Sequence, residues 1–455
     1  MTDRRPALRL DATVVVAAVV VALTVVVSLL VRTDDVRVVV GAGPTESPLE
    51  RSDVVCPAAG TDLRVATTGT AGEVEVRAGR SRSRADVVPG TGTTVDVGER
   101  AAVVTGEGEV APGLVAARFS TPLAAWACGA PAFEQWFTGA GAGARHTSAL
   151  QLVNPDEGRA VVDVVVLGAD GVVDVPALRE LAVRGGETRT IELARLLPRR
   201  DLLTLGVTVV RGRVAASMVD SYQGIGSGGR EGTDALASQP APAERNLLLG
   251  VTGGRGPRQL VLANPGESQG RATLSLVTSD ATFTPGGLEP VDLPPGSTVR
   301  VPLTAVLREA AAGDEDPVAL VVDSTVPTTA TLGMFVRGDL VNATPVAPVE
   351  SQGATPLPKG EKLLVLGGAT RPGVAEVATW DADGEPLATE RVEVGPDSAA
   401  SLELPGRARL VVVRPARTPV EAVVRVTGKG AATLVRVVEP VSTGLVPDVR
   451  PAPVG

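Results

Sequence analysis

The feature that most constrains the fold is an internal repeat with an offset of 110 residues. The stretch LQLVNPDEGRAVVDVVVLGADG (150–171) aligns with LVLANPGESQGRATLSLVTSDA (260–281), and the strand-like segments that follow align at the same offset. A third copy, VLGGATRPGVAEVATWDADG (365–384), has Gly367 in place of the asparagine, and GTTVDV (92–97) belongs to a more diverged first copy. Repeats of this kind indicate one structural unit built several times, so we expect four related modules.

Apolar and polar residues alternate within these repeats, as in ATLSLV and AVVDVVVL. This period of two is typical of a sheet with one buried face. The chain is rich in Val, Gly and Pro and only 2% aromatic, which favours strands and turns over helices. We therefore predict an all-β fold of tandem immunoglobulin-like β-sandwich domains.

Segments rich in Gly, Pro and Ser (138–146, 223–245 and 344–360) separate the repeats and are interpreted as linkers that bury no core. Two short segments, LARLLPRRDLL and LTAVLREAAAG, are predicted as short helices at equivalent places in two repeats. The predicted division is a cytoplasmic tail at 1–11, a transmembrane helix at 12–31, a linker at 32–52, and β-sandwiches 1 to 4 at 53–137, 146–222, 246–343 and 361–445.

The membrane prediction depends on a run of twenty uncharged residues from Ala12 to Val31, which is long enough to cross a bilayer as a helix. Arg4, Arg5 and Arg9 precede it, so the positive-inside rule places the N-terminus in the cytoplasm and the rest of the chain outside. A cleaved signal peptide is the alternative, but it would have a shorter apolar region and a small-residue cleavage site, which LLVRTDD lacks. We expect a single-pass protein of the cell membrane.

The two cysteines, Cys56 and Cys128, both follow the apolar run. We expect them to form a disulfide, because such bonds persist in oxidising compartments. A bridge that closes a loop of about 70 residues would stabilise the first sandwich by on the order of 4 kcal/mol. A metal site or a nucleophilic thiol is the alternative, and neither a CxxC motif nor a second ligand cluster supports it.

Nucleotide and nucleic-acid partners are not expected. The net charge of −9 provides no basic field for phosphates. The run GAGAGAR (139–145) lacks the glycine spacing of a dinucleotide-binding loop. Gly224, Gly226 and Gly229 have that spacing, but the residues after them are rich in Gly and Pro and cannot form the helix that the motif requires. We therefore predict no cofactor.

His146 is the only histidine, so a Ser–His–Asp site, a His-bound zinc or an imidazole proton relay would have to use it. We interpret it as a solvated linker residue. Asp170, Asp280 and Asp383 lie at predicted hairpin tips, where turn chemistry accounts for them. A pair of carboxyl groups for glycoside cleavage is left open, and no catalytic, cofactor-binding or metal-binding residue is predicted.

Aromatic residues concentrate between residues 119 and 137. They either fill the core of the first sandwich and the joint behind it, or form an exposed platform for sugar rings or a partner protein. The arginines of RAGRSRSR (77–84) form either a solvated turn or a contact for an anionic envelope polymer. The candidate contact residues are Phe133, Trp136, Phe137, Arg80 and Arg82.

The order of an N-terminal anchor, then EQWFTGAGAGARHTSALQLVNP, then AVVDVVVLGADG resembles an uncharacterised actinobacterial family of membrane-anchored extracytoplasmic proteins of unknown function. In that family the joint reads closer to W-[WYF]-F-x-G-G-S-T, from which WFTGAGAGA departs. The resemblance implies a place in the cell envelope, beside a membrane glycosyltransferase, and implies no catalytic residues. An arginine-rich, lysine-poor composition matches GC-rich coding, as in actinobacteria.

These observations predict a membrane-anchored extracytoplasmic scaffold or binding protein of the cell envelope that is not an enzyme. The alternatives are an accessory subunit of a membrane glycosyltransferase, a protein that binds envelope polysaccharide, and a glycan-cleaving enzyme. The expected partners are the membrane and an envelope protein or polysaccharide.

Overall fold

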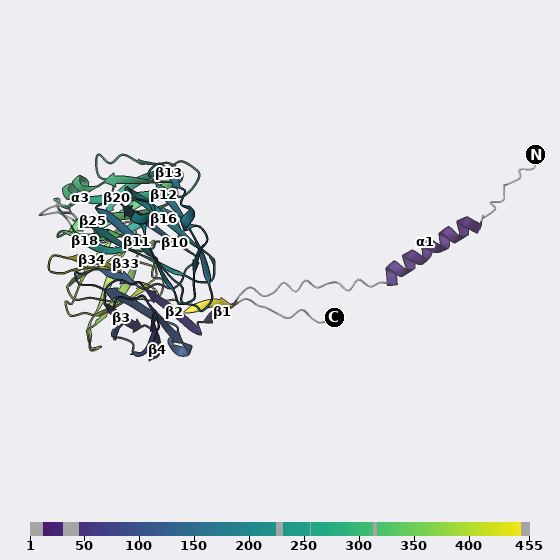
Figure 1. Cartoon of the computed structure of the whole chain (residues 1–455), viewed down its shortest axis with the longest axis horizontal. Coiled ribbons are helices and arrows are strands. Elements are labelled where there is room, and N and C mark those ends of the chain that lie inside the picture. Colours follow the sequence, from purple (N-terminus) through teal and green to yellow (C-terminus); the bar gives the residue numbers. More distant parts are fainter. Residues whose placement is uncertain (1–11, 31–44, 224–230, 255, 313–315, 447–455) are drawn as a thin grey trace, which may run out of the picture. The chain divides into compact units, whose positions relative to one another are not determined.

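The computed structural model describes residues 12–30, 45–223, 231–254, 256–312 and 316–446. It contains two compact units, Met1–Ser47 with Leu445–Gly455, and Pro48–Gly444 (Figure 1). The smaller unit contains α1 (Ala12–Leu30). Within the described ranges no helix is long and apolar enough to span a membrane, so the transmembrane helix predicted at 12–31 is not found. The predicted tail at 1–11 and most of the predicted linker at 32–52 lie outside the described residues.

The larger unit confirms the all-β class and holds four modules of antiparallel strands. In the first module one sheet has the order β2-β7-β4-β5 and the other β6-β3-β8-β9. Its strands are β2 (Arg51–Cys56), β3 (Asp62–Thr67), β4 (Gly72–Ala78), β5 (Ser81–Val87), β6 (Thr93–Asp96), β7 (Ala102–Glu107), β8 (Leu114–Phe119) and β9 (Ala125–Ala127).

The fourth module repeats this arrangement, with sheets β27-β32-β29-β30 and β31-β28-β33-β34. If strands are counted from the start of each module, both modules have the orders 1-6-3-4 and 5-2-7-8. The strands of the fourth module are β27 (Gly353–Pro356), β28 (Glu361–Gly367), β29 (Gly373–Trp380), β30 (Pro386–Val394), β31 (Ala400–Leu404), β32 (Leu410–Ala416), β33 (Glu421–Thr427) and β34 (Ala432–Arg436).

The second module keeps the same strand order but joins its two sheets through β10 and β11, which share the residue pair Ala142 and Thr147. One short extra strand, β14, pairs with β12. The strands are β10 (Glu134–Ala142), β11 (His146–Val153), β12 (Ala160–Gly168), β13 (Gly171–Val173), β14 (Leu181–Val183), β15 (Thr188–Glu192), β16 (Arg200–Arg211), β17 (Ala215–Tyr222) and β18 (Gly232–Leu236).

The third module fuses its sixth and seventh strands into one 18-residue strand, β25, that takes part in both sheets. The predicted short helices are confirmed as α2 (Leu193–Leu196) and α3 (Thr304–Ala310). The strands of this module are β19 (Ala243–Leu249), β20 (Arg258–Asn264), β21 (Gly270–Val277), β22 (Thr282–Phe283), β23 (Val291–Leu293), β24 (Ser297–Pro302), β25 (Ala319–Val336) and β26 (Asp339–Ala343).

The repeated asparagine has the same structural role in two modules. The Asn154 side-chain amide donates to the carbonyl oxygens of Gly158 at 2.7 Å and Val183 at 3.1 Å. The Asn264 amide makes the matching bonds, to Ser268 at 2.8 Å and Leu293 at 3.0 Å. Each asparagine is buried and fixes the turn after its strand, so the motif that revealed the repeat is structural.

The modules do not form the simple series expected from the linkers, because their cores meet at shared boundaries. Ala117, Phe119 and Ala125 of the first module belong to the same buried cluster as the core of the fourth. Further buried clusters join the first module to the second, the second to the third, and the third to the fourth. Each module therefore contacts the next, and the first also contacts the last.

The prediction that the segments 138–146, 223–245 and 344–360 bury no core is therefore wrong. The stretch 138–146 is largely strand and continues β10, so the predicted end of the first sandwich at 137 falls inside a strand of the second module. The other two predicted linkers, 223–245 and 344–360, contribute buried side chains such as Leu236 and Val349. Small residues and prolines in these stretches resemble linker composition, yet here they fit closely packed boundaries. The immunoglobulin-like classification of the sandwiches stays a prediction.

Candidate functional site

A cleft of about 450 Å³ lies at the boundary between the second and third modules. Its size falls within the range of about 300 to 1,000 Å³ common for small-molecule sites. We call it the His146 cleft, because it holds the only histidine of the chain and also the only tyrosine, Tyr222. The lining residues that matter below are Arg145, His146, Asp201, Asp220 and Tyr222 of the second module, and Gln259, Arg300, Phe335 and Asn342 of the third.

His146 begins β11 and is held by a buried carboxylate. Its Nε2 lies 2.8 Å from Oδ1 of Asp220, and the two side chains are 16% and 2% exposed. The Ser148 hydroxyl donates to the same oxygen at 2.6 Å, and the Asn342 amide donates to the other at 3.3 Å. The interpretation of His146 as a solvated linker residue was therefore wrong, because β10 extends to Ala142 and His146 is already the first, mostly buried residue of β11.

Charge pairing sets the protonation of this histidine. Burial opposes the imidazolium form, but the nearby carboxylate of Asp220 and its hydrogen bond outweigh burial, so the pKa of His146 is raised. Arg300 acts against this rise and Asp201 adds to it. His146 and Asp220 therefore form an ion pair when the imidazole is protonated.

The glycine run beside the histidine is part of a strand and not a cofactor loop. Ala140 and Ala142 point into the core of the second module, while the alternate positions are glycines. A Cβ placed on Gly141 would lie 2.4 Å from Cγ and Nδ1 of His146, and a Cβ on Gly143 would lie 1.5 Å from Oδ1 of Asp201. The missing side chains thus make room for His146 and Asp201.

Three rings cross the module boundary along the cleft. The centroids of His146 and Tyr222 lie 5.7 Å apart, in agreement with their direct pairing across β11 and β17. Tyr222 then meets Phe335 of the third module edge-on, with centroids 5.1 Å apart. This row offers ring surface beside polar side chains, a combination that binds ligands with one apolar and one polar face.

The hydrogen bonds at Asp220 bear on what chemistry is available. In a Ser–His–Asp site the serine hydroxyl bonds to the histidine, whereas the Ser148 hydroxyl donates to Asp220. Both oxygens of Asp220 already accept hydrogen bonds. Among the residues with described positions, no group of three or more His, Cys, Asp or Glu side chains could hold a metal ion.

The predicted aromatic contact residues are separated by the structure. Trp136 is 7% exposed and lies in a small cluster with Leu167 and Ala263 at the boundary of the second and third modules, and its Nε1 donates to Glu134 at 2.6 Å. Phe137 is fully buried in the second module. An exposed platform that includes these two residues is therefore wrong; only Phe133, 70% exposed, reaches the surface.

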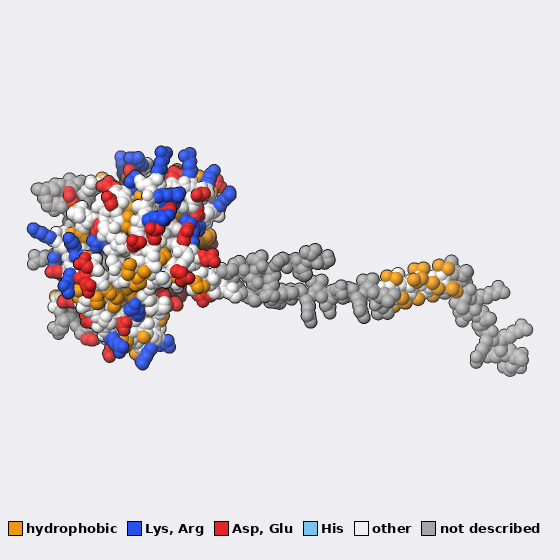
Figure 2. All heavy atoms as spheres, turned by 90° about the horizontal axis from the view of Figure 1, so that it is seen from below, with side chains coloured by type: hydrophobic (Ala, Val, Ile, Leu, Met, Phe, Trp, Pro, Cys, Tyr) orange, Lys and Arg blue, Asp and Glu red, His pale blue; other side chains and the backbone are white. Residues whose placement is uncertain are grey.

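Arg80 and Arg82 lie in exposed positions on the hairpin of β4 and β5. Arg82 is 3.9 Å from Glu75, and the neighbouring Arg84 pairs with Glu73 at 2.9 Å. Acidic and basic side chains are interspersed in the same way over the face shown in Figure 2. The hairpin is thus an exposed surface of mixed charge.

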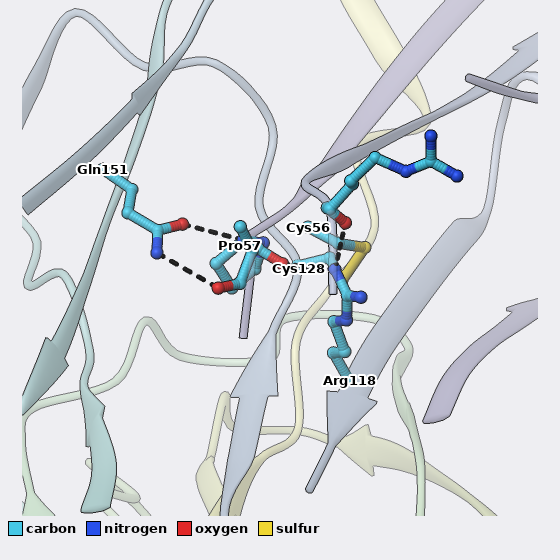
Figure 3. Close-up of a disulfide and its surroundings, with 7 residues drawn as sticks. Cys56, Pro57, Arg118, Cys128 and Gln151 are labelled. Carbon is cyan, nitrogen blue, oxygen red and sulfur yellow. Dashed lines mark hydrogen bonds between the residues drawn. A yellow bond between two sulfur atoms is a disulfide. The ribbon is translucent and has the colours of Figure 1, made fainter. Parts of the chain in front are cut away.

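The disulfide between Cys56 and Cys128 is confirmed, with Cα atoms 4.4 Å apart and a sequence separation of 72. Figure 3 shows Arg118 and Gln151 on either side of the segment after Cys56. The guanidinium of Arg118 donates to the carbonyl oxygens of Pro57, Gly98 and Arg100, and burial lowers its pKa to about 10. Gln151 of the second module bonds to the backbone of residue 58, so the disulfide region is also part of a module boundary.

Sequence reasoning missed the partners of His146. Asp220, Arg300 and Phe335 lie 74 or more residues away, and only strand pairing and module packing bring them to the cleft. The alternation of glycine and alanine in 139–143 was the one local signal, because it fits a strand whose alanines face a core.

Residues 90–405 match a family of unknown function (DUF5719), which is more than half of the chain, and the chain therefore belongs to that family. All of the cleft residues named above lie within the matched region. A comparison with curated proteins found no match to the chain.

Proposed function

We propose that this chain is a non-catalytic, extracytoplasmic binding protein of the cell envelope, and that it takes a saccharide segment in the His146 cleft. The observation that supports this most directly is the convergence of the only histidine, the only tyrosine and Phe335 on one cleft in a chain that is 2% aromatic. Tyr222 and Phe335 supply ring surface for a sugar face. Gln259, exposed on the same cleft, supplies an amide for its hydroxyl groups.

The extracytoplasmic location is supported by the disulfide, because such bonds are rare where the cytosol keeps thiols reduced. Attachment to the membrane through residues 12–31 and an actinobacterial source are parts of the same proposal, and they depend on the sequence alone. Cell fractionation with carbonate extraction tests the attachment. Recovery of the chain in the soluble fraction would contradict it.

Binding is favoured over cleavage because Asp220 is already occupied. A glycoside hydrolase of the usual kind needs two carboxyl groups that both reach the scissile bond. Asp201 and Asp220 both line the cleft, but Asp220 is 2% exposed and accepts hydrogen bonds from His146, Ser148 and Asn342. Its oxygens are committed to the protein and not to a substrate.

The test is calorimetric titration of the full chain with soluble oligosaccharides released from cell-envelope polymers. We expect saturable binding that Tyr222→Ala weakens by about tenfold, as is typical for an aromatic contact at the centre of an interface. Phe283→Ala is the matched control, since Phe283 is an exposed aromatic residue of the third module that does not line the cleft. Equal affinity in the Tyr222→Ala and Phe283→Ala variants, or no binding at all, would count against the proposed function.

A further inference from the structure

We infer that the saccharide taken by the His146 cleft carries an oxyanion, a carboxylate or a phosphate group, which Arg145 and Arg300 hold at the mouth. This inference rests on the proposed function and adds the charge of the ligand. The two arginines line the same cleft, and each comes from a different module.

The charges that a ligand meets are unequal. The described basic and carboxylate side chains around the cleft are Arg145, His146, Arg300, Asp201 and Asp220. Asp220 faces the protein, because it is 2% exposed and its charge is balanced by the His146 contact and by two further donors. Arg145 and Arg300 are both exposed, and the one carboxylate that remains opposite them is Asp201. Cationic groups therefore outnumber anionic groups on the accessible side of the cleft.

Both arginines have guanidinium donors to spare, although only that of Arg300 is held by a contact within the protein. Arg300, in β24, uses one Nη to donate to the backbone oxygen of Asp201, which leaves most of its N–H groups for a ligand. Arg145 lies in the turn between β10 and β11, and its backbone oxygen accepts from the amide of Gln223 at 2.8 Å. Within the described residues the Arg145 guanidinium makes no hydrogen bond or ion pair. A planar guanidinium with free N–H groups suits a carboxylate or a phosphate, which it binds through two parallel hydrogen bonds.

The ring row fixes where the uncharged part of such a ligand lies. Tyr222 and Phe335 meet edge-on at 5.1 Å, and both line the cleft with the two arginines. A sugar that stacks on these rings therefore has its substituents within the same 450 Å³ space as the guanidinium groups. An acidic sugar satisfies both sets of groups, whereas a neutral sugar leaves Arg145 and Arg300 to water.

The experiment titrates the full chain with three probes: a trimer of galacturonic acid, its carboxyl-reduced neutral counterpart, and glucose 1-phosphate. We expect at least one anionic probe to bind about tenfold or more tightly than the neutral trimer, and the preferred anion separates a carboxylate source from a phosphate source. Arg300→Ala should remove most of that preference, and Arg300→Lys should restore part of it. The affinity of the anionic probe should also fall as salt rises.

Arg271→Ala is the matched control, because Arg271 is an exposed arginine of the third module that pairs with Asp292 outside the cleft. Thermal unfolding of each variant separates loss of binding from loss of fold. If the neutral trimer binds as tightly as the anionic probes and Arg300→Ala changes neither, the charge inference is overturned while the proposed function stands. If no probe binds and Tyr222→Ala is also without effect on envelope oligosaccharides, the proposed function fails as well.

Discussion

Gly141 offers the sharpest test of how the strand before His146 builds the cleft. In Gly141→Ala the added methyl group would lie 2.4 Å from Cγ and Nδ1 of the imidazole and 2.8 Å from the backbone oxygen of His146. The ring must therefore move away from residue 141, which disturbs the 2.8 Å contact between its Nε2 and Asp220. We expect the substitution to break that hydrogen bond and to leave the buried Asp220 carboxylate with fewer partners.

The magnitude follows from three contributions. Overpacking at a buried site costs about 1 to 3 kcal/mol. Loss of a hydrogen bond to a charged group costs about 1.5 to 3 kcal/mol. Replacement of glycine stiffens the unfolded chain and returns about 0.4 to 1 kcal/mol. We therefore expect Gly141→Ala to lower the free energy of unfolding by about 1.5 to 5.5 kcal/mol.

Urea unfolding followed by tryptophan fluorescence measures the effect, because Trp136 lies on the same strand, β10. A second measurement uses the single histidine, which gives one imidazole signal in a proton NMR titration. Without the hydrogen bond to Asp220, the pKa of His146 should fall from its raised value. The control is Gly158→Ala in the same module, where an added Cβ meets nothing within 4 Å. Equal stability of the two variants, together with an unchanged imidazole titration in Gly141→Ala, would refute the reasoning.

Three further predictions concern stability. The pKa of His146 is raised in the folded chain, so the His146–Asp220 pair stabilises the fold fully below the ordinary pKa of about 6.5, and this stabilisation is lost as pH rises through the folded pKa. His146→Asn should therefore be less stable than the wild type in acid and approach wild-type stability in alkali. A difference in urea midpoint between the two proteins that stays constant across pH would contradict this. Asn154→Ala and Asn264→Ala should each lower the free energy of unfolding by about 1 to 3 kcal/mol. Because the two positions lie in different modules, the double variant should lose the sum of the two effects within about 0.5 kcal/mol. If either single substitution leaves stability unchanged, the two asparagines do not share the same role. Replacement of Cys56 and Cys128 by alanine should lower the stability of the first module by on the order of 4 kcal/mol. Chemical reduction of the wild-type disulfide is the matched measurement. If reduction destabilises less than replacement does, part of the stabilisation comes from the packing of the cysteine side chains and not from the covalent bond.

The all-β class and the repeat could be predicted because both are local properties of the sequence. Alternating residues such as those of β21 place every second side chain on a buried face, and the structure shows that pattern. Residues 110 positions apart also have the same structural role, since Asn154 and Asn264 make matching hydrogen bonds. The disulfide followed from there being only two cysteines to pair.

The boundaries between modules could not be predicted, because they depend on contacts far apart in the chain. From the sequence, Trp136 and Phe137 could either fill a core or form an exposed platform. On a strand the two side chains point to opposite faces, so both are buried only if each face of β10 is covered. Phe137 enters the core of the second module, and Trp136 is covered from the other side by Ala263 of the third. The composition of 138–146 added to the error, since glycine and alanine are equally common in linkers and in closely packed strands.

The same packing determines what kind of site the His146 cleft is. The boundary beside it is tied by buried polar contacts: the hydroxyl groups of Thr138 and Thr329 lie 2.5 Å apart, and the Gln239 amide donates to the Thr331 hydroxyl at 3.0 Å. Contacts of this kind leave little freedom for the second and third modules to move apart, because separation would leave buried polar groups without hydrogen-bond partners. A ligand therefore meets Tyr222 and Phe335 already in position and does not have to close a hinge, so less of its binding free energy is spent on ordering the protein.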